Sequence, residues 1–169
     1  EFAPHAARWD AEAAVPHAAV LRLAEQGFLG MGIPEEWGGL GYDARTIAIV
    51  IEEIARVSAA LAIMIAVHNS VGALPVFRFG TDEQRKRYLP RLVSRELGAF
   101  SLSEPGAGSD AGAIEATAVR DGDSYVLNGS KNWVTNGMCA GVILVFARTG
   151  KVEGSKGLTC FIVERGAAG

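Results

Sequence analysis

The 169-residue sequence predicts an α+β protein: an all-α helical part over residues 1–96, then an antiparallel, β-barrel-like part over residues 97–169. Two observations predict this division. Apolar residues recur with the helical period of about 3.6 in the first part, whereas the second shows strand-like runs separated by Asp-Gly and Asn-Gly pairs. Because no helical crossover separates the predicted strands, short turns should join them, as in an antiparallel meander or barrel.

Two amphipathic helices are predicted in the first third of the chain. The segment 16–26 gathers its apolar residues on one side and is followed by Gly27, a typical helix stop. Asp43 is a good N-cap for the second helix, in which apolar residues recur at i, i+3, i+4, i+7 and i+8. These are Ile47, Val50, Ile51, Ile54 and Ala55. Residues 33–41 between the two helices contain three glycines within four residues and predict a loop.

Two further helices complete the predicted helical part. Residues 59–77 are apolar nearly all round, so we expect them in the middle of the helical layer. Residues 57–77 lack Asp, Glu, Lys and Arg, as a membrane span would, but the polar residues 68–70 and Pro75 interrupt the apolar run and favour a buried core helix. Thr81 and Gln84 form a capping box, which begins a helix that extends to about residue 93.

The second part is predicted to form strands. Residues 113–120 and 124–127 should pair as a hairpin around Asp121-Gly122. Asn128-Gly129 and Asn136-Gly137 repeat this signal on either side of residues 131–135, which we interpret as another strand. Residues 142–147 and 158–163 are apolar, β-rich runs separated by a polar loop.

Composition excludes several classes of protein. A hydrophobic fraction of 49% and a charged fraction of 21% exclude disorder. The net charge is −3, and without a long Lys/Arg run we expect neither nucleic-acid nor membrane partners. Two cysteines are too few for a disulfide scaffold, and the three histidines lack the spacing of metal ligands, so no metal is expected.

Residues 100–110 hold the densest group of chemical candidates. Gly106 and Gly108 fit a loose G-x-G-x-x-A pattern, but a dinucleotide-binding loop would run directly from a strand into a helix, and Ser103-Glu104-Pro105 intervenes here. Two interpretations remain open. The glycine amides, with the Ser109 hydroxyl, form an anion-binding nest, or the segment is a tight surface turn.

Glu104 is expected to hydrogen-bond local backbone amides and shape this loop rather than act as a general base. No G-x-S-x-G motif is present, which argues against a hydrolase nucleophile.

A second candidate lies at Trp133 and Thr135. An aromatic face and a hydroxyl two residues apart would share one side of a strand and would suit a flat, hydrogen-bonding ring. The alternative is a core tryptophan beside a β-forming threonine.

Four segments together resemble the acyl-CoA dehydrogenase family, in particular its short-/branched-chain-like members. Residues 102–110 (LSEPGAGSD) and 127–136 (LNGSKNWVTN) carry most of the resemblance. Residues 34–41 (PEEWGGLG) and 157–163 (GLTCFIV) also match the family's pattern. The order and spacing of these motifs cover nearly the whole chain, so the resemblance is highly specific. It implies a helical N-terminal domain followed by a β middle domain.

The resemblance also implies FAD as the cofactor. It places Leu102 and Ser103 near the flavin ring, Trp133 and Thr135 beside it with the Thr135 hydroxyl near N5, and Ser109 at phosphate-bearing parts of FAD or acyl-CoA. The implied cofactor-binding residues are Phe100, Leu102, Ser103, Gly108, Ser109, Trp133, Val134 and Thr135.

The acyl group is implied to lie beside the helix formed by residues 59–77. On an α-helix Met64, Val67, His68 and Val71 share one face. The implied substrate-binding residues are therefore Ser109, Met64, Val67 and Val71. The alternative is that this stripe packs only against neighbouring helices.

The implied reaction is the α,β-dehydrogenation of an acyl-CoA thioester to a 2-enoyl-CoA, with electrons passed to electron-transferring flavoprotein. The family's C-terminal helical bundle, which usually carries the catalytic Glu, is absent, so we expect a fragment without a catalytic residue of its own. A homotetramer in full-length form and a cytoplasmic location, or the mitochondrial matrix in a eukaryote, are also implied. Two alternatives remain: a non-catalytic flavin- or CoA-binding subunit of this fold, and a flavin oxidase of the same superfamily.

Overall fold

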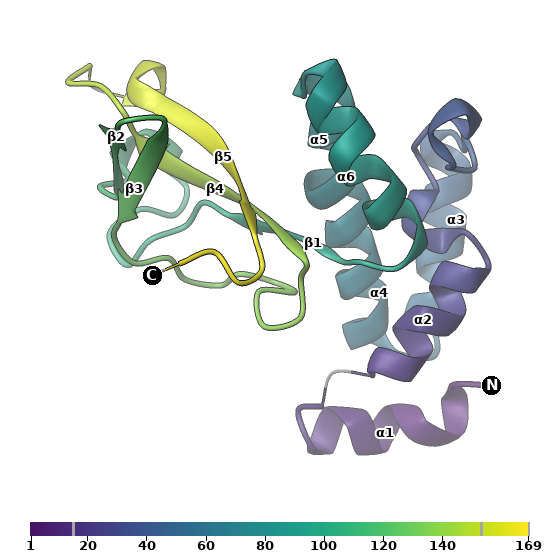
Figure 1. Ribbon diagram of the computed structural model, residues 1–169. Helices are drawn as coiled ribbons and strands as arrows, with labels where there is room; N and C mark the ends of the chain where they lie inside the picture. Colours follow the sequence, from purple (N-terminus) through teal and green to yellow (C-terminus); the bar gives the residue numbers. More distant parts are fainter. Residues whose placement is uncertain (15, 153, 169) are drawn as a thin grey trace.

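The computed structural model describes residues 1–14, 16–152 and 154–168, which form a helical half and a sheet half (Figure 1). The helices are α1 (Ala3–Ala11), α2 (His17–Glu25), α3 (Ala44–Ala55), α4 (Ala59–Val67), α5 (Leu74–Phe79) and α6 (Asp82–Ser94). The strands are β1 (Gly98–Ser101), β2 (Thr117–Asp121), β3 (Ser124–Asn128), β4 (Val142–Arg148) and β5 (Leu158–Glu164). A π-helical turn, η3 (His68–Ala73), joins α4 to α5, and short 3₁₀ turns occur at η1 (Phe28–Gly30), η2 (Glu35–Trp37), η4 (Ala111–Ala113) and η5 (Gly154–Gly157). The predicted class, helices followed by a β part, is confirmed.

Side chains cap the helices where the sequence predicts. The Asp43 carboxylate accepts a hydrogen bond from the third residue beyond it at 2.8 Å, and the reciprocal bonds of the Thr81–Gln84 capping box are 2.9 and 3.2 Å. Gly27 ends α2 with a φ of +80°, which a residue without Cβ adopts easily. Ser58 caps α4 in the same way as Asp43, accepting from the Leu61 amide. These local signals therefore mark where α3, α4 and α6 begin and where α2 ends.

The apolar stretch after residue 58 forms a core helix interrupted by η3. By length and composition, Ala59–Phe79 could cross a membrane, yet half of its most apolar window is buried inside the protein. Leu61, Ile65 and His68 have no exposed surface at all. The stretch therefore packs as the buried central helix that its sequence predicts, but its axis carries a widened turn at His68–Ala73 that was not predicted.

The β1 strand lies directly against this π-helical turn. A Cβ on Gly72 would come within 2.9 Å of the Gly98 backbone, so two glycines allow the two main chains to meet. His68 fixes the contact, because its Nδ1 accepts a 2.7 Å hydrogen bond from the Gly98 amide. Its Nε2 lies 2.8 Å from the Leu29 carbonyl oxygen, so the neutral ring carries its proton on Nε2.

The sheet is mixed, and the prediction that it is antiparallel throughout is wrong. β4 is central: β5 pairs with it antiparallel along its full length, whereas β1 pairs with it parallel. β2 and β3 form the predicted antiparallel hairpin, and β2 meets the end of β4 in parallel through a single residue pair. A parallel pair needs a long connection, and here the hairpin and the segment 129–141 provide it between β1 and β4. The Asp-Gly and Asn-Gly pairs predict the hairpin, but they carry no information about the long connection between β1 and β4.

Strand β2 is also shorter than predicted. It begins at Thr117, because residues 111–113 form η4 instead. Arg148 holds this region by donating to the carbonyl oxygens of Gly112 and Ile114.

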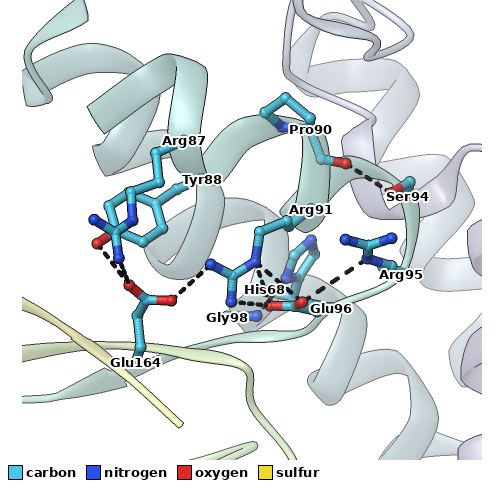
Figure 2. A network of polar contacts seen from close by, with 10 residues as sticks. All are labelled: His68, Arg87, Tyr88, Pro90, Arg91, Ser94, Arg95, Glu96, Gly98 and Glu164. Carbon is cyan, nitrogen blue, oxygen red and sulfur yellow. Dashed lines mark hydrogen bonds and ion pairs between the residues drawn. The ribbon is translucent and has the colours of Figure 1, made fainter. Parts of the chain in front are cut away.

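A shared core and an ion-pair network join the two halves. Val142 and Leu144 of β4 pack in one buried cluster with residues of α5 and α6. Beside this cluster, Arg91 of α6 donates to Glu164 at 2.7 Å and to Glu96 at 3.1 Å, while Arg87 also binds Glu164 (Figure 2). The two guanidinium groups hold the pKa of Glu164 below its ordinary value. The end of β5 is thereby attached to α6.

The burial of neutral His68 makes stability depend on pH. Burial lowers the pKa of His68 from 6.5 to about 4, so between these values the unfolded chain binds more protons than the folded one. Stability should be fully present above about pH 7 and fall as pH drops towards 4, by roughly 2–4 kcal/mol from this group. Urea unfolding between pH 4 and 8 measures this.

His68→Gln should remove this contribution from the pH dependence, whereas His17→Gln, a change at an exposed helix start, should keep it. An unchanged slope in His68→Gln would contradict the assignment.

Candidate functional site

The two segments that the sequence singles out lie side by side. The Asn132 amide donates to the Ser103 carbonyl oxygen at 2.8 Å, and Lys131 Nζ donates to the Leu102 carbonyl oxygen at 3.0 Å. The stretch after β1 is therefore bonded to the stretch between β3 and β4. This brings Leu102 and Ser103 close in the fold to Trp133, Val134 and Thr135.

Glu104 lies at the centre of this junction. Its carboxylate accepts from the Glu115 amide at 2.6 Å, the Ala116 amide at 3.0 Å and Lys131 Nζ at 2.7 Å. Burial alone would raise the pKa of Glu104, but the two amides and the ammonium group together hold it below its ordinary value. The expectation that the Glu104 carboxylate binds backbone amides is confirmed, but these amides lie 11 and 12 residues further along the chain rather than within the loop.

The glycine-rich loop is a tight turn. Glu104 and Ala107 exchange two backbone hydrogen bonds of 2.9 and 3.1 Å around Pro105-Gly106. No α-helix follows, only the three-residue η4, so the phosphate loop of a dinucleotide-binding fold is excluded. The amides of Gly106, Gly108 and Ser109 make no hydrogen bond to any residue that the structure describes. The turn therefore leaves these donors available to a ligand.

The prediction of a strand at residues 131–135 is wrong. These residues have no regular structure, and the chain turns from Thr135 onward. Trp133 has a φ of +60°, which is rare for a bulky residue, and its side chain is 90% exposed. The hydrogen bonds from Lys131 and Asn132 replace a strand ladder, so Trp133 and Thr135 are not placed by strand alternation. The alternative of a core tryptophan is also wrong.

Asn136 connects this segment to the rest of the protein, and we did not predict it from the sequence. Its Nδ2 donates to the Met64 carbonyl oxygen of α4 at 2.9 Å and to that of Gly98 in β1 at 3.2 Å. Its φ of +67° is one that asparagine tolerates better than most residues. The Asn-Gly pair signals a turn, but it does not reveal that the side chain would be buried.

The stripe expected to line an acyl pocket is split by the fold. Met64 lies in the helical core and His68 is fully buried against β1, whereas Val67 and Val71 are half-buried. The π-helical turn breaks the α-helical spacing from which a common face was predicted. Phe100 is half-buried with its ring centre 5.1 Å from that of Phe146.

The residues present fit a flat, hydrogen-bonding group. The exposed indole of Trp133 offers a stacking face. The Ser103 amide and the hydroxyls of Ser103, Ser109 and Thr135 make no hydrogen bond within the described part of the chain. In that same part, no three His, Cys, Asp or Glu residues group together to hold a metal ion.

The chain thus consists of a helical part followed by a β part, with an exposed aromatic side chain and unbonded donors on adjoining loops of the β part. Comparison with known families agrees with this order of parts. A model described as the acyl-CoA dehydrogenase N-terminal domain matches residues 1–96, and one described as the acyl-CoA dehydrogenase middle domain matches residues 99–169. The chain belongs to the acyl-CoA dehydrogenase family.

Individual relatives align with nearly all of this chain, but the aligned region is only part of each relative's own length. An acyl-CoA dehydrogenase of Bacillus subtilis is 40% identical over 170 residues, covering 100% of this chain and 45% of that protein. A mitochondrial short-chain specific acyl-CoA dehydrogenase of Mus musculus is 42% identical, covering 96% of this chain and 40% of that protein. The chain thus spans less than half the length of these relatives.

Solved structures show the same fold. A chain in a structure of the electron transferring flavoprotein of Acidaminococcus fermentans matches with a TM-score of 0.93 and 39% identity, covering 98% of this chain and 44% of that one. Butyryl-CoA dehydrogenase of Megasphaera elsdenii matches at 0.91 and 36%, with the same coverage. An acyl-CoA dehydrogenase of Bacillus anthracis complexed with FAD matches at 0.77 and 39%, covering 86% and 25%.

Asn136 should contribute to stability through both its side chain and its backbone. Asn136→Gly keeps the positive φ but removes two buried hydrogen bonds and should cost about 1–3 kcal/mol. Asn136→Ala also forces a residue with Cβ into the left-handed region and should cost roughly 1–2 kcal/mol more. Chemical denaturation measures both.

The matched control is Asn128→Ala, at the other Asn-Gly pair, where the side chain is exposed and the change should stay within about 0.5 kcal/mol. Equal losses in the glycine and alanine variants at position 136 would show that its backbone conformation contributes nothing.

Proposed function

We propose that this chain is the N-terminal and middle part of an FAD-dependent acyl-CoA dehydrogenase that converts an acyl-CoA to a 2-enoyl-CoA and passes electrons to electron-transferring flavoprotein. The observation that carries the proposal is the exposed Trp133 beside unused donors at Ser103 and Thr135, in a chain of this family. The relatives named above support the substrate class, and the Acidaminococcus structure supports the electron acceptor.

The proposed cofactor site is built on the two adjoining loops. Phe100, Leu102, Ser103, Gly108, Ser109, Trp133, Val134 and Thr135 would hold FAD, which when bound supplies a two-electron acceptor. Trp133 presents an aromatic face that shields a ring from water, and the Thr135 hydroxyl donates a hydrogen bond to it. The Gly108 and Ser109 amides supply donors for phosphate oxygens. The protein's contribution here is binding and orientation.

The proposed substrate site adjoins it. Ser109 would bind the CoA part, while Met64, Val67 and Val71 would contact the acyl tail individually, since the π-helical turn keeps them from forming one continuous α-helical face. Val67 and Val71 are the more accessible of the three, since Met64 is 9% exposed. We propose no catalytic residue in this chain; Glu104, the carboxylate in the loop after β1, already accepts three hydrogen bonds.

We also propose residues 1–96 and 97–169 as two domains of a longer, tetrameric protein. The end of α6 at Ser94 and the start of β1 at Gly98 support that division. A cytoplasmic location, or the mitochondrial matrix in a eukaryote, follows by analogy with relatives such as the mitochondrial mouse protein.

The test uses the full-length protein purified with its flavin. Butyryl-CoA and an artificial electron acceptor should yield a 2-enoyl-CoA, detected by chromatography of the CoA esters. Bound flavin without turnover of any acyl-CoA would favour a non-catalytic subunit instead. Stoichiometric hydrogen peroxide in air would favour a flavin oxidase.

Thr135 should contribute to FAD affinity through its hydroxyl. In the full-length protein, Thr135→Val removes one donor with little change in shape and should raise the dissociation constant for FAD about three- to tenfold. Thr135→Ser keeps the hydroxyl and should bind nearly as well as the wild type. Quenching of flavin fluorescence measures both, and equal affinity in the valine and serine variants would remove Thr135 from the site.

A further inference from the structure

We propose that the buried ion pair between Glu104 and Lys131 is a positioning element for the ring-binding site, and that it turns the Ser103 backbone N–H toward the bound cofactor. This inference deepens the proposed function and rests on it, because the ring in question is the proposed flavin. Glu104 and Lys131 act through the backbone and need not touch the ring themselves.

The burial of this pair sets it apart. The Glu104 and Lys131 side chains are 7% and 10% exposed, whereas every other ion-paired side chain in the described ranges is at least 25% exposed. Removing two charges from water is costly, so a buried pair is weak support for stability by itself. Its hydrogen bonds to the backbone indicate which part of the structure the ion pair orients.

Lys131 determines which way the Leu102–Ser103 peptide faces. Its Nζ binds the Leu102 carbonyl oxygen at 3.0 Å, and no described peptide bond is cis. In a trans peptide the C=O and the following N–H point in opposite directions. The Ser103 N–H therefore points away from Lys131, and it makes no hydrogen bond to any described residue.

The same segment also binds the carbonyl oxygen of the next peptide. The Asn132 amide holds the Ser103 carbonyl oxygen at 2.8 Å, and the following amide, of Glu104, points away and donates to Ala107 at 2.9 Å. The Leu102–Ser103 peptide thus leaves its N–H unbonded, while the N–H of the Ser103–Glu104 peptide closes the turn with Ala107. A rotation of the first peptide would withdraw the Ser103 donor from the site.

The carboxylate gives the ammonium group a fixed position. Glu104 accepts from the Glu115 and Ala116 amides at 2.6 and 3.0 Å, where the chain approaches β2. Lys131 is thus held between the segment after β1 and the approach to β2. Without Glu104, a flexible lysine side chain would have no defined position under the Leu102 carbonyl.

The experiment compares three variants in the full-length protein by FAD dissociation constant and thermal unfolding. Lys131→Met removes the donor and leaves a buried carboxylate, so both affinity and stability should fall, with the dissociation constant rising about tenfold or more. Glu104→Gln/Lys131→Met removes both charges. It should be more stable than Lys131→Met while its FAD affinity stays weak, because methionine cannot bind the Leu102 carbonyl.

The matched control is Arg85→Met. Arg85 also joins one backbone carbonyl, that of Phe77 at 2.7 Å, to one carboxylate, that of Asp82 at 2.9 Å, but it lies in the helical half. Its loss should lower the unfolding temperature and leave FAD affinity unchanged.

Two outcomes would overturn the inference while leaving the proposed function intact: wild-type FAD affinity in Lys131→Met, or recovery of affinity together with stability in the double variant. If Lys131→Met does not fold, the double variant alone decides, with weakened binding supporting the inference and wild-type binding overturning it. A wild-type protein that binds no FAD would overturn both the inference and the proposed function.

Discussion

The contact between β1 and the π-helical turn positions the whole sheet half. His68 accepts a hydrogen bond from the Gly98 amide, and Gly72 lets the two backbones meet at that point. β1 in turn pairs with β4, the central strand to which β5 and the end of β2 are bonded. The segment that leaves β1 is the one that carries Leu102 and Ser103. The buried His68 contact thus helps to set the position of the candidate site relative to the helices, together with the shared core, the Arg91–Glu164 ion pair and the Asn136–Met64 hydrogen bond.

Four elements of the fold were predictable because their signals are local. The caps at Asp43 and Thr81, the end of α2 at Gly27 and the β2–β3 hairpin each depend on a few adjacent residues. The parallel pairing of β1 with β4 was not predictable, since partners about 40 residues apart in sequence leave no periodic signal. The π-helical turn was hidden for a different reason. Two of its three polar residues, His68 and Asn69, form hydrogen bonds with backbone groups of distant segments.

The candidate site was only partly predictable. The stretches 100–110 and 133–135 were identified by residue type and by resemblance, and the structure brings Ser103 and Asn132 into direct contact. Their backbone was not foreseen, because the two Asn-Gly pairs suggested a strand between turns. Instead Trp133 and Asn136 both have positive φ values, and the segment is held by Lys131 and Asn132. Such a conformation costs about 1–3 kcal/mol per residue and persists where surrounding contacts enforce it. Here those contacts are hydrogen bonds to β1, α4 and the loop after β1.

The environment of Glu104 indicates a structural role for this residue rather than a role as a general base. A general base needs a pKa near the working pH and a lone pair directed at its proton. The donors around Glu104 hold its pKa below the ordinary value, and three of them already occupy its oxygens. Its buried charge therefore serves to fix Lys131 and, through it, the peptide between Leu102 and Ser103. The described loops provide an aromatic face and unbonded donors, and the proposed function assigns to them the binding and alignment of a ring. A carboxylate that abstracts a proton in the proposed reaction would need to accept fewer hydrogen bonds than Glu104 does.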